Sequence, residues 1–296
     1  RPMVTRPEES AALPYHIDLV SFRAEDGFPL DGLFYSPKAG ATTAVILVHG
    51  KTCNFLGGPS RFLPLPLARA GYASFAVNMR VHSLGYSRGD VPFENFDTFV
   101  FNMAGGAWEK LEDGHKDLGG AVGYLRRLGF EQVVLAGHSS GGFYAGDYAG
   151  RDPALAGLIL FSPLTTNKFA LGAWFKSPKE LDETRKKADA MVAAGQGHFL
   201  LPLPTWYYAI SAAAFLDRLA ERPGWWDEHV GRARIPTLLL YADRESRAAE
   251  WEQKFRDVIK TPRKELVCIK NSEHMYLGHE DEVADAVISF LKKYPA

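Results

Sequence analysis

The chain has few cysteines, no long apolar run and no excess of charge. Of its 296 residues only 2 are cysteine, and 34 basic against 35 acidic residues give a net charge of −1. Two cysteines cannot build a disulfide framework, and balanced charge does not favour a nucleic-acid or anionic-membrane surface. No apolar run approaches the ~20 residues of a membrane-spanning helix. We therefore expect a globular chain with no nucleic-acid partner and no membrane span.

Cys53 and Cys268 are expected to be free thiols. They lie near predicted strands that a sheet would separate by several positions, at about 4.8 Å per strand. A disulfide needs Cα atoms within roughly 7 Å of each other. Free thiols fit a reducing compartment, so a cytoplasmic location is expected.

Two common signatures of bound metals and cofactors are also missing. The sequence has no H-E-x-x-H motif and no paired cysteines, which disfavours a metal site. No G-x-G-x-x-G pattern follows a predicted strand and opens a helix, which disfavours a nucleotide cofactor. We expect chemistry that side chains perform without a metal or a cofactor.

Apolar runs alternate with amphipathic stretches along most of the chain, which predicts a mostly parallel sheet with helices on both faces. A turn at Asp26-Gly27 predicts a hairpin of residues 17–22 and 30–35. Further strands are expected at 43–48, 72–77, 132–136, 155–161, 237–241 and 265–269, and helices at 63–70, 108–128, 248–259 and 280–293. Residues 164–232 interrupt this alternation, with helices expected at 179–194 and 206–219.

The most informative stretch is Gly137-His138-Ser139-Ser140-Gly141, which follows an apolar run and precedes a helical segment. A G-x-S-x-G pattern between strand and helix is typical of a nucleophile elbow. A Cβ at Gly137 or Gly141 would collide with the neighbouring strand or helix. We therefore predict that Ser139 is a nucleophile; the alternative is a glycine-rich loop with an incidental serine.

With these residues in place, the chain resembles the α/β-hydrolase superfamily over about residues 15–294. The resemblance is carried by His49-Gly50, Gly137–Gly141, the acidic loop Asp243–Glu245 and Glu273-His274, in the family's order of nucleophile, acid and histidine. It implies an α/β-hydrolase fold with an eight-stranded, mostly parallel sheet in residues 1–163 and 233–296, and a helical lid inserted at 164–232. Val48-His49-Gly50 and the lid position look most similar to serine esterases, lysophospholipase-like enzymes and dienelactone-hydrolase relatives.

A serine hydroxyl needs a base within hydrogen-bond reach and a third group that orients the base. His274 is the predicted base, because a short loop connects it to strand 265–269 and places it at the sheet edge near Ser139. His279 is the runner-up. His49 is expected to make structural hydrogen bonds, and His138 must point sideways from the elbow.

The orienting acid is either Glu245 or Asp243. Relatives often carry the acid three places after a Gly or Ala at the strand end, and counting from Ala242 gives Glu245. The shorter aspartate is the commoner residue in this role, and Asp243 lies nearer the strand. We predict a hydrogen bond of roughly 2.6–3.2 Å between Glu245 and His274, with Asp243 bonded to loop backbone or facing water.

The resemblance also implies an oxyanion hole formed by the backbone N–H groups of Ser140 and Lys51. Such donors stabilise the negative charge that develops on the substrate oxygen. The side chain of Lys51 is expected to be a solvent-facing charge.

The lid segment is rich in aromatic residues, most of which are expected to pack the lid against the body: Trp174, Phe175, Trp206, Tyr207, Tyr208, Trp225 and Trp226. Ligand sites are mostly apolar with few polar anchors. We expect Trp206, Tyr207, Phe55 and Phe143 to line an apolar pocket for the substrate.

These expectations favour a serine hydrolase that cleaves a carboxylic ester of a small to medium apolar substrate through an acyl-enzyme, with lactones and thioesters as related substrates. Amide or carbon–carbon bond hydrolases with the same triad are the enzymatic alternative. A binding protein on a hydrolase fold is the non-enzymatic one, since fold alone does not establish function.

Overall fold

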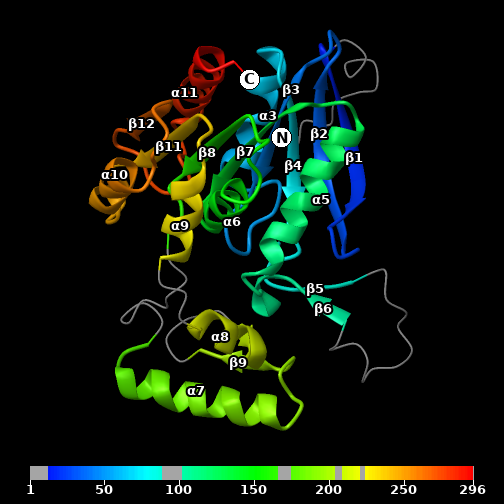
Figure 1. Cartoon of the computed structure of the whole chain (residues 1–296). Helices are drawn as coiled ribbons and strands as arrows, with labels where there is room; N and C mark the ends of the chain where they lie inside the picture. Colours follow the sequence, from blue (N-terminus) through cyan, green and yellow to red (C-terminus); the bar gives the residue numbers. More distant parts are fainter. Residues whose placement is uncertain (1–12, 89–101, 166–174, 204–208, 221–223, 296) are drawn as a thin grey trace.

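Eight strands form one sheet with the order β1-β2-β4-β3-β7-β8-β11-β12 (Figure 1). The computed structural model describes residues 13–88, 102–165, 175–203, 209–220 and 224–295. The strands are β1 (Tyr15–Arg23), β2 (Pro29–Pro37), β3 (Thr43–Val48), β4 (Ala73–Asn78), β7 (Gln132–His138), β8 (Gly157–Phe161), β11 (Thr237–Ala242) and β12 (Lys264–Ile269). β1 and β2 form the predicted hairpin, β2 is antiparallel to β4, and the other pairs are parallel.

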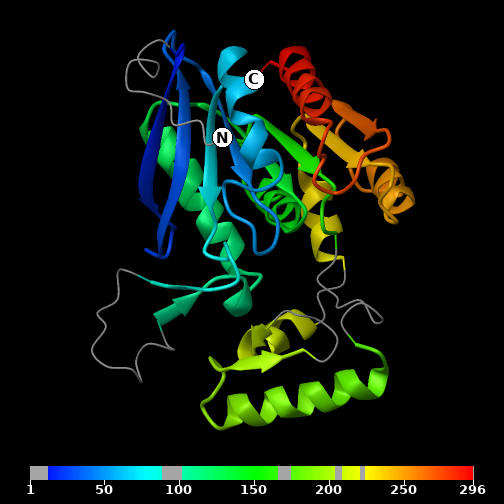
Figure 2. The same ribbon diagram turned by 180° about the vertical axis from the view of Figure 1, so that it is seen from behind.

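Helices cover both faces of the sheet, as Figures 1 and 2 show from opposite sides. One face carries α5 (Asp113–Arg127), α6 (Ser140–Ala149), α9 (Trp225–Arg232) and α10 (Ala248–Asp257), and the other carries α2 (Pro59–Phe62), α3 (Pro64–Arg69) and α11 (Glu280–Lys293). Along β3, Ile46 and Val48 pack in the first face's hydrophobic cluster, and Val45 and Leu47 in the second. Successive strand side chains point to opposite faces, so a continuous apolar run supplies both clusters. The predicted fold class is confirmed.

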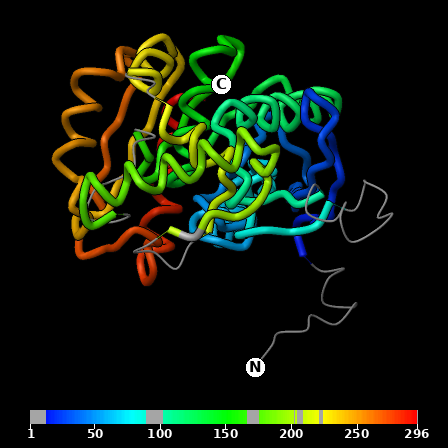
Figure 3. The backbone as a smooth tube through the Cα atoms, turned by 90° about the horizontal axis from the view of Figure 1, so that it is seen from below, coloured from blue at the N-terminus to red at the C-terminus, as the bar shows by residue number. Residues whose placement is uncertain are grey.

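A segment between β8 and β11 departs from the alternation. Its elements are α7 (Pro178–Ala193), β9 (Leu200–Pro202), β10 (Ala209–Ser211) and α8 (Ala212–Leu219). They enclose a hydrophobic cluster of their own, made of Phe175, Ala188, Leu201, Leu203, Ile210, Ala212, Ala214 and Phe215. Figures 1 and 3 show these elements lying across the edge where the parallel strands have their carboxyl ends. We call the described parts of residues 175–220 the insertion.

The lid expected over 164–232 extends too far at its carboxyl end. Helix α9 packs against α6, and Trp226 and Val230 are buried in the same cluster as the α6 side chains. Gly146 allows this approach, because a Cβ there would lie 2.6 Å from Trp226 Nε1. Trp225 and Trp226, expected among the lid aromatics, therefore lie in a helix of the main body.

The helix predicted over 108–128 begins only at Asp113. Residues before it form a 3-10 helix, η2 (Gly106–Trp108), followed by an extended Glu109. The Leu111 N–H donates to Asp217 Oδ2 of α8 at 3.1 Å, where a helix would use its own carbonyl. The sequence pattern did not reveal that this stretch contacts the insertion.

Cys53 and Cys268 are free, as expected. Among the helices of the described residues, none has the length and apolarity needed to span a membrane.

Candidate active site

Ser139 lies at a sharp turn between β7 and α6, with φ 56° and ψ −117°. A positive φ is uncommon in residues other than glycine and stores strain of order 1–3 kcal/mol. The surrounding chain holds the turn: the Ser139 N–H donates to Phe161 O at 3.0 Å, and its carbonyl accepts from the Leu164 N–H at 2.8 Å. The Ser139 side chain stays partly exposed at the carboxyl edge of the sheet.

Three glycines allow backbone to approach this turn. A Cβ on Gly137 would lie 2.3 Å from Gly141 O, and one on Gly141 would lie 2.4 Å from Val48 O. A Cβ on Gly50 would lie 3.2 Å from Ser139 Cβ. The predicted collisions at Gly137 and Gly141 are confirmed, and the loop after β3 packs directly against Ser139.

Gly141→Ala should lower the free energy of unfolding by at least about 2 kcal/mol, because its Cβ would meet backbone that cannot rotate away. Gly123→Ala in α5 is the matched control, since the nearest atom to its Cβ would be Arg127 Nη1 at 3.4 Å. Alanine there should be neutral or stabilise by up to about 1 kcal/mol. Urea unfolding curves give both values, and equal effects at the two positions would contradict the collision at Gly141.

Glu245 and His274 come together from the loops that follow β11 and β12. Glu245 Oε2 lies 2.6 Å from His274 Nδ1, within the distance predicted for the pair. The Nδ1–H therefore donates to the carboxylate, and Nε2 is the ring nitrogen left for a proton transfer. Glu245 is mostly buried, with 14% of its side chain exposed, whereas His274 is 41% exposed.

His274 also lies beside the elbow. His138, the residue before Ser139, donates from Nε2 to the His274 carbonyl oxygen at 2.8 Å, and the two rings lie 4.6 Å apart. Within the described part of the chain, the hydrogen bonds of His274 are those to Glu245 and His138, and none reaches Ser139 Oγ. Catalytic hydrogen bonds are often longer before substrate binds.

The second oxygen of Glu245 has a partner that was not predicted from the sequence. Ser162 Oγ donates to Glu245 Oε1, and the same Ser162 oxygen lies 2.7 Å from Tyr276 OH. Tyr276 is fully buried, and burial raises the pKa of its hydroxyl well above the usual value, so it stays protonated. The position of Ser162 directly after β8, at the carboxyl edge of the sheet, could have indicated a residue of the site.

Asp243, the alternative acid, does not contact His274. Its N–H donates to Ile269 O at 3.1 Å, while its Oδ1 is buried without a hydrogen-bond partner among the described residues. The residue as a whole is partly exposed, so the alternative that its side chain faces water fits in part. The acid loop turns between the two residues, so only the longer and later Glu245 reaches the histidine.

The other histidines differ from His274 in their partners. His49 Nδ1 donates to Gly50 O at 2.8 Å, and its Nε2 accepts from the Met79 N–H at 3.1 Å. These are the structural hydrogen bonds expected of it. His279 Nδ1 lies 3.3 Å from Glu282 Oε2 at the start of α11.

Burial of His49 should make the protein lose stability in acid. Burial lowers the pKa of His49 to about 4, from 6.5. Below pH 6.5 the unfolded chain therefore binds a proton that the folded chain refuses, so stability falls as pH falls from 6.5 to 4. A His49→Gln variant should lose about 3 kcal/mol less than the parent over this interval, on the scale of its pKa shift. Urea unfolding at each pH measures this; His16→Gln, at an exposed site, is the control, and a parental slope in His49→Gln would contradict the assignment.

Ser140, one predicted oxyanion donor, is the first residue of α6. Its N–H has no acceptor within the helix, and the positive end of the helix dipole favours negative charge there. Lys51, the other predicted donor, follows Gly50 in the loop that packs on Ser139. The expectation that its side chain faces solvent is wrong. The side chain is only 15% exposed, and its ammonium forms an ion pair with buried Glu109. Aliphatic burial and a carboxylate partner hold it inside.

Comparison with known proteins identifies the family. A model of the alpha/beta hydrolase family matches residues 45–286. The chain belongs to the alpha/beta hydrolase family. No curated protein sequence matches it.

Solved structures of alpha/beta hydrolases resemble most of the chain. DcsB, solved in complex with its substrate analogue, has a TM-score of 0.71 and 17% identity, with 95% of this chain and 100% of that chain covered. Est1E from Butyrivibrio proteoclasticus, with ferulic acid bound, has a TM-score of 0.63 and 17% identity over 93% of this chain and 99% of that one. A dienelactone hydrolase from Anabaena variabilis has a TM-score of 0.60 and 16% identity over 95% and 99%. At these identities the likeness shows the fold alone.

The residues expected to line the pocket of this alpha/beta hydrolase have different surroundings. Phe143 is 3% exposed and packs edge-on against Tyr144 and Trp225, so it is a core residue of α6 and not a pocket residue. Phe55 is partly exposed, and its N–H donates to Asn78 Oδ1 at 3.0 Å. Trp206 and Tyr207 lie outside the described residues.

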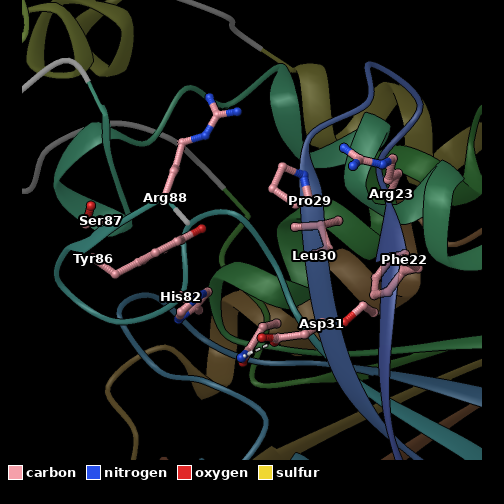
Figure 4. A pocket seen from close by; sticks show the side chains of 11 residues that line it. Phe22, Arg23, Pro29, Leu30, Asp31, His82, Tyr86, Ser87 and Arg88 are labelled. Atoms are coloured by element: carbon pink, nitrogen blue, oxygen red, sulfur yellow. Dashed lines mark hydrogen bonds between the residues drawn. The ribbon is translucent and has the colours of Figure 1, made fainter. Parts of the chain in front are cut away.

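A cavity of about 510 Å³ opens on the hairpin side of this alpha/beta hydrolase, between β1, β2 and the loop after β4 (Figure 4). Its lining includes Asp31, which accepts from Asn78 Nδ2 at 2.7 Å, and His82, whose ring stacks on that of Tyr86 with centroids 4.1 Å apart. The cavity lining includes none of the predicted catalytic residues. Asn78 connects it to the Phe55 backbone, next to the predicted oxyanion loop.

Proposed function

We propose that this protein is a serine hydrolase that cleaves a carboxylic ester through an acyl-enzyme, with Ser139 as nucleophile, His274 as base and Glu245 as the acid. The observation that carries this proposal is the contact of 2.6 Å between Glu245 Oε2 and His274 Nδ1 beside the elbow. The strained turn at Ser139 and the family membership support it. The dienelactone hydrolase among the similar structures makes ester cleavage the preferred reaction, because a lactone is a cyclic ester.

In the first half-reaction, Ser139 Oγ attacks the carbonyl carbon of the ester and its proton passes to His274 Nε2. The N–H groups of Ser140 and Lys51 stabilise the oxyanion. Glu245 stabilises the imidazolium, which then protonates the leaving alcohol as the carbon–oxygen bond breaks. In the second half, water attacks the acyl carbon while His274 takes its proton. The bond from the acyl carbon to Ser139 Oγ then breaks, His274 returns the proton to Ser139 Oγ, and the carboxylic acid leaves.

The substrate is a small molecule that binds at the carboxyl edge, under the insertion, which acts as a lid. Phe55 is a proposed apolar contact, because it is partly exposed beside the loop that follows β3. Apolar contacts of this kind fix the acyl or alcohol part of the substrate while a few polar groups orient the reacting carbonyl.

A panel of matched substrates tests the proposal. It should contain p-nitrophenyl esters of short and medium acids, an aryl ester, a lactone, a thioester and the anilides of the same acids. We expect ester cleavage well above the anilide rate. Faster cleavage of the anilides would indicate an amidase, and cleavage of none of them above background would contradict the ester assignment.

A further inference from the structure

A single buried carboxylate joins the insertion to the predicted oxyanion loop. Glu109, only 4% exposed, follows η2 and accepts from three side chains. Lys51 and Arg218 both contact its Oε2, the latter at 2.9 Å, and Tyr144 OH donates to its Oε1. Lys51 comes from the loop after β3, Tyr144 from α6 and Arg218 from α8, so three separate elements meet at Glu109.

Glu109 is ionised although it is buried, and it is paired with the cations Lys51 and Arg218. Burial alone would raise the pKa of Glu109, but the charges of Lys51 and Arg218 and the hydrogen bonds from Lys51 and Tyr144 lower it to about 2. Burial lowers the pKa of Lys51 to about 8, with the nearby charge of Arg218 also lowering it and Glu109 opposing this. Buried ion clusters of this type usually stabilise less than apolar side chains of the same size. A contribution to stability therefore does not explain the buried charges well. Positioning of the chain segments that carry them explains them better.

The positions of Lys51 and Tyr144 indicate which parts of the chain Glu109 holds together. Gly50 packs against Ser139, and Lys51 is the next residue. Tyr144 lies on the helix that begins at Ser140. Glu109 therefore fixes the loop that carries one predicted oxyanion donor relative to the helix that carries the other.

The insertion also contacts residues that precede and follow Glu109 in the sequence. Trp108 Nε1 donates to the His198 carbonyl oxygen at 2.9 Å, and the Leu111 N–H donates to Asp217 Oδ2 at 3.1 Å. Arg218, the next residue of α8, reaches Glu109 between them. A docked insertion therefore places its own cation on the group that holds Lys51.

We infer that Glu109 is a positioning residue that couples docking of the insertion to the oxyanion hole, by holding the Lys51 backbone N–H in place when Arg218 is seated. This inference rests on the proposed serine-hydrolase function. Oxyanion donors act on charge that develops only in the transition state, so misplacing one lowers kcat and leaves KM nearly unchanged.

The test uses Lys51→Met, which keeps the backbone N–H and the Glu109–Arg218 pair but removes the tether. We expect kcat per active site, counted by fluorophosphonate titration, to fall by about 10–100-fold with KM within about 3-fold, less than complete removal of a donor would cause. Affinity for a trifluoromethyl ketone should fall by a similar factor, because Ser139 adds to its carbonyl, the hydroxyl proton passes to His274 and the oxyanion enters the hole. Lys254→Met, which breaks the ion pair between α10 and Asp227 of α9, is the matched control and should keep the parental kcat.

A double-mutant cycle tests the coupling itself. Arg218→Met should lower kcat about 3–10-fold in the parent but less than about 2-fold in the Lys51→Met background, because both act through Glu109. If Lys51→Met fails to fold, Tyr144→Phe removes only one hydroxyl from the same carboxylate and should lower kcat several-fold with KM unchanged. Parental kcat per titrated site in these variants, or equal effects of Arg218→Met in both backgrounds, would overturn the inference. A parent that neither cleaves esters nor reacts at Ser139 would instead overturn the proposed function.

Discussion

Replacing Ser139 with alanine should lower the rate of ester cleavage by at least ~10³, because no other group replaces the nucleophile. The remaining rate should come from substrate binding and oxyanion donors alone. The fold should be unaffected, since serine and alanine carry the same Cβ in the strained turn at φ 56°. Steady-state kinetics and thermal unfolding of the purified variant measure the two effects separately.

A serine on β2, Ser36, provides the control, and Ser36→Ala should keep the parental rate. A Ser139→Ala variant that hydrolyses esters as fast as the parent would end the serine-hydrolase interpretation. A variant that loses activity only because it unfolds would be recognised by its melting temperature.

Glu245→Gln should lower the rate by up to ~10⁴, the scale expected when the orienting acid loses its charge. The amide keeps the size of the side chain, but it no longer stabilises the imidazolium. It also offers an N–H to His274 Nδ1, which favours the wrong tautomer for a base at Nε2. The measurement is kcat/KM for the best ester of the panel, together with the free energy of unfolding.

Asp243→Asn is the matched control, because it makes the same chemical change two residues earlier in the same loop. It should change the rate by less than about 3-fold, as Asp243 has no contact with His274 and the acid acts only through that contact. A large loss in Asp243→Asn with a small one in Glu245→Gln would reverse the assignment of the acid and leave Ser139 and His274 as proposed.

The sheet could be predicted from the sequence because parallel strands that are covered on both faces have continuous apolar sequences. Residues 43–48 coincide with β3, and 280–293 coincide with α11. The elbow glycines could also be predicted from the sequence. A Cβ on Gly141 would lie 2.4 Å from Val48 O, so only glycine fits at that position. These features depend on local pattern or on steric exclusion.

Features that depend on distant contacts were not readable. The residues of α9 fell in the predicted lid because 164–232 interrupt the alternation of strands and helices, and only the packing of α9 on α6 shows that it belongs to the body. Phe143 looked like a pocket residue because it is near Ser139 in sequence, yet its helical position turns it into the core.

Charged groups inside the protein were the hardest to anticipate. Lys51 has no sequence signal that distinguishes a buried lysine from an exposed one. Its partner Glu109, and Arg218, which pairs with the same carboxylate, lie far along the chain, and only the fold brings the three together. The support that Ser162 gives to Glu245 has the same origin, since it joins the ends of two neighbouring strands.

Labelling with a fluorophosphonate, followed by mass spectrometry of the digested protein, tests the central claim most directly. The reagent reacts with a serine only when that serine is activated as a nucleophile. We expect one phosphonylated peptide, the one containing Ser139, with no labelling in Ser139→Ala and much slower labelling in His274→Ala. Labelling of Ser139→Ala at the parental rate, or no labelling of a folded parent, would contradict it.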